Sequence, residues 1–512
     1  MSSLPRPRPR LLAAAAVLAG ALLLPAVPAT SGASAVASAV ASSADAEPQI
    51  DAPPLLRATE ALRGRPGDLD RPEATLALRD LFLARPGLGD DGDSLAESLL
   101  ARPTHRARDP YGDGYTVPST KTCSRHFCVH HVTSTTDAPA RPSWPATTLA
   151  VLEDVWRHHV ERLGYRPPAP DGRRGGDARF DVYLKDVGSR GVYGYCAPER
   201  RVTGKPKQAS GFCVLDNDFA RSQYGRAPRQ SLRVTAAHEF FHAVQFAYDF
   251  AEDPWLLEST ATWMEERYAD DVDDNRAYLR FGQLARPRVP LDRFEPTGYA
   301  HYGNWPFWEY LGQRFGTDVV RQVWRRAGTG GLPDDDSAQA LRHVLAKRGG
   351  LPRVFADYAS GNTVPARTYP EGSVYPAAPV AVRRLGGAQR RTTVVSRLDH
   401  LTSRSVRLVP DASLRPGTRL TITVKGPVAR RSPAVALLVV GADGTATRRP
   451  IALNRNGWGR AVLRLDPGSV ASATVTLANA STRYRCDRGT TFACRGTPVD
   501  QRQRFELKAF VR

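Results

Sequence analysis

Several features that would place this chain in other protein classes are missing from its 512 residues. Beyond the first 31 residues there is no second long apolar stretch, so the mature chain is not expected to span a membrane. No internal repeat of fixed period is present. The basic residues form no dense block with interleaved aromatics, so nucleic-acid binding is not predicted.

The net charge of +19 comes from 71 basic and 52 acidic residues, and most of the basic ones are arginine. One interpretation is attraction to anionic surfaces. We favour the other, which is an arginine-rich composition spread over the whole chain.

Cysteine is scarce, with six residues in the sequence. In an exported chain such cysteines pair, because the compartment is oxidising. The short loops between neighbours favour three local disulfides: Cys123 with Cys128, Cys196 with Cys213, and Cys486 with Cys494. The alternative is that some of them are free thiols or metal ligands.

Residues 1–31 have the pattern of a signal peptide. Arg6, Arg8 and Arg10 precede an apolar run over 11–24, and prolines and small residues follow it. The run is short for a membrane span, although an uncleaved anchor remains the alternative. No cysteine lies near the expected cleavage region, which argues against a lipid anchor there. The predicted location is therefore extracellular, as a secreted protein.

The chain is long enough for two or three folding units, and 41% apolar residues allow real cores. An Ala-, Ser- and Pro-rich linker is expected over 32–54. A helical segment follows over 55–110, either as a removed propeptide or as the first helices of the enzyme domain. A mixed domain is predicted over 111–365 and a β-rich domain over 366–512.

Local patterns predict the elements of these two domains. Helices are expected over 149–163, 231–249, 254–268, 304–315 and 338–348, and strands over 128–133 and 180–184. Short β-rich runs between turn residues are expected at 405–409, 420–425, 435–440, 461–465, 473–477 and 505–511. The predicted fold class is α+β, with an all-β sandwich at the C-terminus.

The segment 235–245 contains H-E-x-x-H, with His238, Glu239 and His242. On a helix, residues four apart lie on one face, so two imidazoles can bind one Zn²⁺. The apolar residues of this segment form a separate stripe, which indicates an amphipathic helix. Glu239 is expected to act as the general base for a zinc-activated water.

A third ligand is expected on the next helix, because a catalytic zinc site uses three protein ligands and leaves one position open. Asp253 suits the N-cap and Pro254 the first helical position, and the short turn before them favours an antiparallel helix pair. Glu258 and Glu265 share one face of that helix. Counting along the helices does not choose between them.

Together the two segments resemble the gluzincin clan of zinc peptidases, which combine H-E-x-x-H with a ligating Glu, often in a W-L-N-E-G-x-A pattern. This chain has Trp255-Leu256-Leu257-Glu258-Ser259-Thr260-Ala261. The resemblance implies a zincin-like domain, Glu258 as the third ligand and Glu265 in the layer behind the ligands. Leu257 and Ser259 depart from the usual Asn and Gly.

A closer similarity, over roughly 74–315, is to secreted bacterial proteins whose metalloprotease activity is itself inferred. It is carried by five stretches of the sequence: 123–130, 193–196, 213–219, the helix of His238, and 271–279. This similarity implies the fold and zinc more than it implies a substrate.

Other residues are weaker candidates. Tyr302 is the expected donor to the developing oxyanion, with His301 and Tyr299 behind it, and the alternative is an ordinary packed aromatic. Asp249 follows His242 by seven residues and is expected to orient a ligating imidazole, or else to be a helix-end acid. The strand over 180–184 is a candidate for pairing with an extended substrate, or simply core.

Acidic runs raise calcium as a second metal, because Ca²⁺ accepts oxygen ligands. The loop lacks EF-hand spacing, and the alternative is a solvated turn. The residues concerned are Asp270, Asp271, Asp273, Asp274 and Asn275, and the same holds for Asp216, Asn217 and Asp218.

The sequence therefore predicts a secreted zinc metalloendopeptidase that cleaves protein or peptide substrates. Two other functions compete with it. One is a surface- or polymer-binding protein with an inactive zincin-like domain, and the other is a zinc hydrolase of non-peptide amides or esters. The number of subunits is left open.

Overall fold

The computed structural model describes residues 53–63, 73–105, 114–328 and 335–512. All of them belong to one compact unit that spans Glu47–Arg512. The predicted signal peptide and nearly all of the predicted linker lie outside the described residues. None of the described helices is long and apolar enough to cross a membrane.

A five-stranded sheet forms the first layer beside the candidate site. Its order is β1-β2-β3-β5-β4, with β2, β3 and β5 parallel and the outer strands antiparallel. The strands are β1 (Thr120–Cys123), β2 (Phe127–His131), β3 (Phe180–Lys185), β4 (Gly194–Val202) and β5 (Lys205–Asp216). Because β3 lies between β2 and β5, the expectation that 180–184 offers a sheet edge is wrong. The edge strands are β1 and β4.

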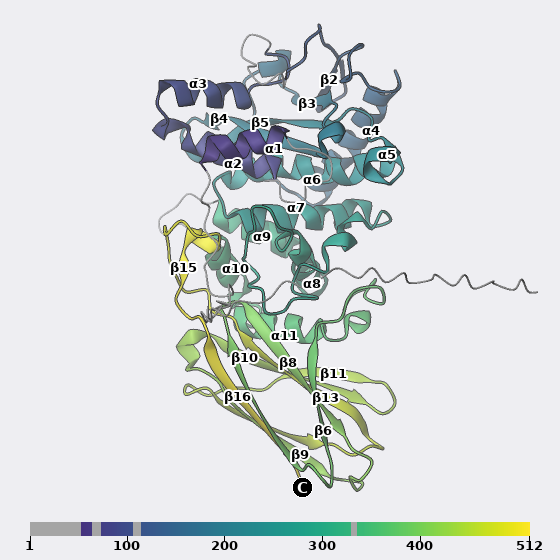
Figure 1. Ribbon diagram of the computed structural model, residues 1–512, viewed down its shortest axis with the longest axis vertical. Coiled ribbons are helices and arrows are strands. Elements are labelled where there is room, and N and C mark those ends of the chain that lie inside the picture. The colour runs from purple at the N-terminus through teal and green to yellow at the C-terminus, as the bar shows by residue number, and fades with distance from the viewer. Residues whose placement is uncertain (1–52, 64–72, 106–113, 329–334) are drawn as a thin grey trace, which may run out of the picture. The chain divides into compact units, whose positions relative to one another are not determined.

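Two long helices, α6 (Pro228–Asp249) and α7 (Pro254–Ala269), follow the sheet. Each begins with proline at its first position, where the missing N–H costs nothing. Helix α6 packs between β5 and α7 (Figure 1). Nearly every residue of α6 after Gln230 is buried, so the expected amphipathic helix is instead enclosed by protein on all sides.

The N-terminal helices pack against the same layers. They are α1 (Pro54–Arg63), α2 (Ala74–Ala84) and α3 (Asp90–Leu99), and α2 contacts β4. A guanidinium N–H of Arg79 on α2 donates to the backbone oxygen of Glu252, at 2.8 Å. The segment is therefore joined to the turn between α6 and α7.

A buried arginine fixes the end of this N-terminal segment. The side chain of Arg102 is 1% exposed and binds three carboxylates, those of Asp171, Asp181 and Glu199. The bond to Asp171 measures 2.7 Å and the bond to Glu199 measures 2.8 Å. Each carboxylate comes from the mixed domain, so removing Arg102 would leave negative charge buried without a partner.

The remaining helices complete the middle region. They are α4 (Trp144–Trp156), which continues as a π-helical turn Arg157–Arg162, α5 (Arg221–Tyr224), α8 (Trp305–Phe315), α9 (Asp318–Ala327), α10 (Ser337–Ala346) and α11 (Leu351–Gly361). Helix α8 packs on α7. Five tryptophans are among the largest fully buried side chains, two of them on α7 and three on α8 and α9: Trp255, Trp263, Trp305, Trp308 and Trp324.

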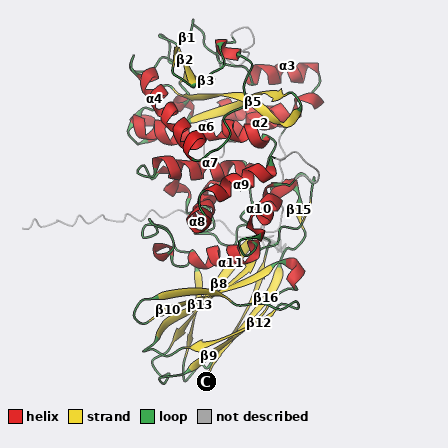
Figure 2. Cartoon of the chain, turned by 180° about the vertical axis from the view of Figure 1, so that it is seen from behind, coloured by secondary structure: helices red, strands yellow, loops and turns green. Residues whose placement is uncertain are grey.

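The C-terminal region is a sandwich of two antiparallel-rich sheets around one core (Figure 2). The first sheet has the order β11-β10-β13-β8-β6 and the second has the order β12-β9-β16-β7. The strands are β6 (Val380–Leu385), β7 (Arg391–Leu398), β8 (Thr402–Pro410), β9 (Arg419–Lys425), β10 (Pro433–Gly441), β11 (Ala446–Pro450), β12 (Trp458–Arg464), β13 (Val470–Asn479), β14 (Tyr484–Arg485), β15 (Thr497–Pro498) and β16 (Gln503–Val511). The predicted α+β fold class is confirmed.

Buried polar contacts join the middle and C-terminal regions. Asp292 accepts bonds from Tyr484 at 2.7 Å and from the backbone N–H of Ala493 at 3.1 Å, and it pairs with His400 Nε2 at 2.9 Å. Asp253 lies at the N-cap position of α7 without a side-chain capping bond, and its carboxylate instead accepts the backbone N–H of Cys494 at 2.9 Å. The C-terminal region therefore supports the start of α7.

The three disulfides are the local pairs that the spacing suggests: Cys123–Cys128, Cys196–Cys213 and Cys486–Cys494. None of the described cysteines is free. Three disulfides fit a protein of an oxidising, extracytoplasmic compartment.

Replacing Arg102 tests whether the N-terminal helices belong to the cooperative fold of the chain. We expect Arg102→Met to lower the free energy of unfolding by about 3–5 kcal/mol, because three buried carboxylates lose their partner. Chemical denaturation measures this. Arg125 is exposed, so Arg125→Met should change stability by less than about 0.5 kcal/mol. Equal stability of both variants would show that the segment is not part of the cooperative fold.

Candidate metal centre

Three residues from the helix pair converge on one point. His238 and His242 lie one turn apart on α6, and Glu258 lies on α7. One ligand atom from each residue can be chosen such that all three lie within 4.8 Å of one another. The Nε2 atoms of His238 and His242 are 3.4 Å and 3.5 Å from the two carboxylate oxygens of Glu258.

The other nitrogen of each imidazole is held by a second residue. His238 Nδ1 lies 2.6 Å from Glu265 Oε1, and His242 Nδ1 lies 2.7 Å from Gln245 Oε1. Gln245 is itself fixed, because its amide donates to the backbone oxygen of Leu257 at 2.8 Å. Carboxylate and amide oxygens accept hydrogen bonds, so in the neutral imidazole of each residue Nδ1 carries the proton and Nε2 has the lone pair that could bind a metal.

The cluster contains buried polar atoms without partners among the described residues. They are Nε2 of His242 and both carboxylate oxygens of Glu258. Both side chains are fully buried, with 0% exposure. An unpartnered buried carboxylate is costly, and two imidazole lone pairs facing it are the donor set of a divalent cation. The residues therefore fit a metal ion, and these three would hold it.

Burial and neighbouring charges shift the pKa values of the three clustered residues. Burial raises the pKa of Glu258, but the imidazoles of His242 and His238 outweigh it and hold that pKa at about 2. Burial lowers the pKa of His242 to about 4. Burial also lowers the pKa of His238, but the nearby carboxylates of Glu258 and Glu265 outweigh burial and hold it well above its usual value. The cluster is electrostatically suited to a cation.

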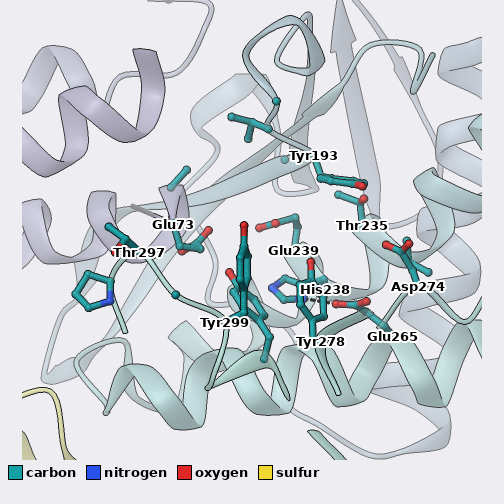
Figure 3. Close-up of a pocket in the computed structure, with 18 residues that line it drawn as sticks. Glu73, Tyr193, Thr235, His238, Glu239, Glu265, Asp274, Tyr278, Thr297 and Tyr299 are labelled. Carbon is teal, nitrogen blue, oxygen red and sulfur yellow. Dashed lines mark hydrogen bonds and ion pairs between the residues drawn. The ribbon is translucent and has the colours of Figure 1, made fainter. Parts of the chain in front are cut away.

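Glu239 lies beside the cluster and faces a cavity of about 200 Å³. His238, Glu73 and four tyrosines also line this cavity: Tyr193, Tyr278, Tyr299 and Tyr302 (Figure 3). Burial raises the pKa of Glu239 to about 7, while His238 opposes the rise. Gly194, the first residue of β4, lies against the side chain of Glu239. A Cβ at this position would meet Glu239 Cγ at 3.2 Å. The cavity thus reaches one ligand and the expected base together.

Thr75 is a site residue that the sequence analysis missed. Its hydroxyl donates to Glu239 Oε2 at 3.1 Å and accepts the backbone N–H of Cys196, on strand β4, at 3.0 Å. Glu73 caps α2 and accepts the backbone N–H of Thr75 at 2.8 Å, which places the threonine. No local pattern signals this contact, because Thr75 and Glu239 are 164 residues apart in sequence.

Tyr302 and His301 lie next to the cluster. The ring of Tyr302 is 6.1 Å from that of His238, and burial raises its pKa well above the usual value, so its hydroxyl keeps its proton. His301 Nε2 is buried without a partner among the described residues. Burial lowers the pKa of His301 to about 4, and the nearby carboxylate of Glu258 opposes this shift. Tyr299 lines the cavity farther out.

Asp249 does not reach the histidines. Its carboxylate pairs with Lys207 at 2.9 Å and accepts the backbone N–H of Ala251 at 2.9 Å. Gln245 holds His242 in the way proposed for Asp249. Glu265 does contact a ligating histidine, as described above.

The acids suggested for calcium mostly have partners within the protein. Asp271 binds Arg233, Asp274 binds Arg226, and Asp273 binds Arg276. Asn275 donates to Glu266, and Asp216 accepts three backbone N–H groups. Asp270 lies with Glu266 and Glu371 in a partly exposed group of carboxylates. Calcium stays a prediction.

Comparisons with known proteins do not identify the chain. No protein family matches it, and no curated protein matches it. Among solved structures, PliG from Aeromonas hydrophila, a periplasmic inhibitor of g-type lysozyme, is 10% identical with a TM-score of 0.15. It is covered over 97% of its length and matches 26% of this chain. CorA, a surface-associated copper-binding protein of Methylomicrobium album BG8, is 10% identical with a TM-score of 0.17, covered over 100% of its length and 26% of this chain. Neither likeness supports an argument about this chain.

Metal analysis of three glutamate variants tests the ligand set. We expect about one divalent ion per chain in the wild type and none in Glu258→Gln. Glu265→Gln should weaken metal affinity about 10–100-fold, because His238 loses the group that orients it. Elemental analysis after dialysis, with zinc titration against a competing chelator, measures both.

Glu266 provides the matched control for these variants. It follows Glu265 on α7 and hydrogen-bonds Asn275 instead of the cluster. Burial raises its pKa to about 8, so the neutral Glu266→Gln should retain the ion. A Glu258→Gln protein that keeps a full complement of metal would exclude Glu258 as a ligand.

Proposed function

We propose that the chain is a secreted zinc metallopeptidase of the gluzincin type, cleaving internal peptide bonds of proteins. The observation that carries this proposal is the pair of unpartnered imidazole and carboxylate groups in the cluster beside Glu239. His238, His242 and Glu258 would hold the ion. A zinc ion bound there would polarise the scissile carbonyl and acidify the attacking water.

Glu239 supplies the acid–base chemistry in this proposal. Its carboxylate faces the cavity and accepts the proton of the attacking water, then delivers it to the leaving amine. The hydroxyl of Thr75 holds Oε2, which leaves Oε1 for the water. Tyr302 supplies a protonated hydroxyl on the cavity wall for the developing oxyanion.

The N-terminal helices stay in the mature enzyme under this proposal. Thr75 positions the base, and Arg102 and Arg79 tie the same segment to the mixed domain. A propeptide that must leave would take these contacts with it. Export follows from the signal-like pattern of residues 1–31 and agrees with the three disulfides.

Glu239→Gln separates catalysis from metal binding. We expect the variant to retain its ion and to lose about 10²–10⁴-fold or more in kcat, because it cannot accept a proton. Cleavage of casein, with and without a chelator, and hydrolysis of small amides and esters measure the activity. Wild type and variant with equal activity would favour the binding-protein alternative. Activity on small esters without casein cleavage would favour the non-peptide hydrolase.

Thr75→Val tests the positioning of the base. We expect kcat to fall about tenfold with little change in KM, because Glu239 loses a charge-assisted hydrogen bond but the cavity keeps its shape. Thr75→Ser should restore most of the activity. Thr148 is buried, and its hydroxyl has no hydrogen-bond partner among the described residues. Thr148→Val therefore controls for the loss of a buried hydroxyl. An unchanged kcat in Thr75→Val would remove Thr75 from the mechanism.

A further inference from the structure

The positive charge of the chain is concentrated at one end of the sequence. Residues 366–512 contain 26 Lys and Arg against 8 Asp and Glu, whereas residues 1–365 contain 45 against 44. Nearly the whole excess of +19 thus belongs to the β-sandwich region. The expectation that the basic residues are spread evenly over the whole chain is therefore wrong.

Many of these basic residues lie on the outward side of one sheet of the sandwich. In the sheet β12-β9-β16-β7, alternate residues point into the core and away from it, as strand geometry requires. We call the outward side the basic sheet face. Its exposed arginines without a carboxylate within ion-pair distance, among the described residues, are Arg391, Arg397, Arg419, Arg460 and Arg464.

The arrangement of these arginines costs stability. Arg464 on β12 lies directly opposite Arg419 on β9, and Arg504 on β16 lies directly opposite Arg397 on β7. Like charges at such positions are destabilising by about 0.2–1 kcal/mol a pair. The acid among the outward residues of these four strands is Glu506, which Arg504 and Lys508 already bind at 2.5 Å and 2.6 Å. The fold gains nothing from the repulsion, so a ligand that neutralises it is the better explanation.

Apolar and hydroxyl groups lie between the cations. Trp458 is 48% exposed and Phe510 is 37% exposed, and both point outward on this face. The Lys425 ammonium lies 5.1 Å from the centre of the Trp458 ring. Thr423 on β9 and Thr393 on β7 flank Lys508 on β16 in the same row of the sheet, between the rows of Trp458 and Phe510. Cations for acidic groups, rings for apolar faces and hydroxyls for hydrogen bonds are the contacts that a charged sugar polymer uses.

We propose that the basic sheet face binds an acidic polysaccharide, and so attaches the protein to an anionic glycan outside the cell. Guanidinium groups match carboxylates in a bidentate geometry, so the arginines of this face suit such a ligand. The three disulfides place the protein where such glycans occur.

Two other polyanions fit the face less well. Single-stranded nucleic acids stack their bases on open aromatic rings, whereas the ring of Trp458 on this face is partly covered by Lys425. Its outward residues also include no Asn or Gln on β7, β9, β12 or β16 to read base edges. An anionic membrane would call for a larger apolar element to insert.

Charge reversal at two opposed positions tests this proposal in the full-length protein. Arg397→Glu with Arg464→Glu places an acid opposite Arg504 and Arg419, so thermal stability should hold or rise. Affinity for polygalacturonate at low salt should fall about tenfold or more. Binding by the wild type should weaken as salt increases, and neutral dextran should not bind.

A second pair of substitutions controls for net charge. Arg384 on β6 and Arg449 on β11 are exposed arginines of the other sheet. Arg384→Glu with Arg449→Glu changes the total charge equally and should keep affinity within about twofold. Arg397→Gln with Arg464→Gln should weaken binding without creating new ion pairs, which covers any misfolding of the first variant.

Three results would overturn the proposal. Equal losses in the face and control variants would show attraction by net charge alone. Tighter, face-dependent binding of a single-stranded DNA oligonucleotide would identify a nucleic acid as the partner. Tighter, face-dependent binding of phosphatidylserine vesicles would identify a membrane. Each readout is binding and needs no hydrolysis, so it stands apart from the peptidase proposal.

Discussion

The carboxylate of Glu258 is the group on which the centre of the structure depends. It is fully buried and faces the imidazoles of His238 and His242 without a hydrogen bond of its own. Glu239 and Glu265 lie in the same cluster, and burial raises the pKa of each of these carboxyls to about 7. A cation at this point would offset the cost of burial. The same helix pair forms the core of the middle region. Substitutions that disturb the packing of this pair would therefore affect both the site and the stability of the fold.

Order in the cluster comes from residues that do not bind the ion. Glu265 and Gln245 fix the two imidazole rings, and Thr75 fixes Glu239. Such supporting bonds set both the tautomer and the aim of a ligand, which a metal site needs before it can select a cation. Thr75 comes from the N-terminal helices, which explains why a segment that resembles a propeptide is packed against strand β4.

The sequence was informative where the geometry is local. His238 and His242 are separated by one helical turn, and a short turn brings Glu258 and Glu265 onto the next helix, so the spacing located the helix pair. The choice of Glu258 over Glu265 came from the resemblance to gluzincins. Long-range contacts had no such signal, and Thr75 was missed for that reason. Asp249 has the right helical spacing, but Lys207 from the neighbouring strand binds it. Helix α6 looked amphipathic because its polar residues bond to groups on neighbouring elements, such as Glu265 on α7 and Thr75 on α2, which periodicity cannot distinguish from contact with water.

The division of charge follows the division of chemistry. The first 365 residues are nearly balanced, with 45 basic and 44 acidic, and the cavity beside Glu239 is lined by acids and tyrosines. A catalytic cavity with strong positive charge nearby would attract the same polyanions as the basic sheet face and become blocked by them. Under the two proposals, placing the arginines on the β-sandwich would separate attachment from hydrolysis. The buried contacts of Asp292 with His400 and Tyr484 join the middle region and the β-sandwich in one folded unit.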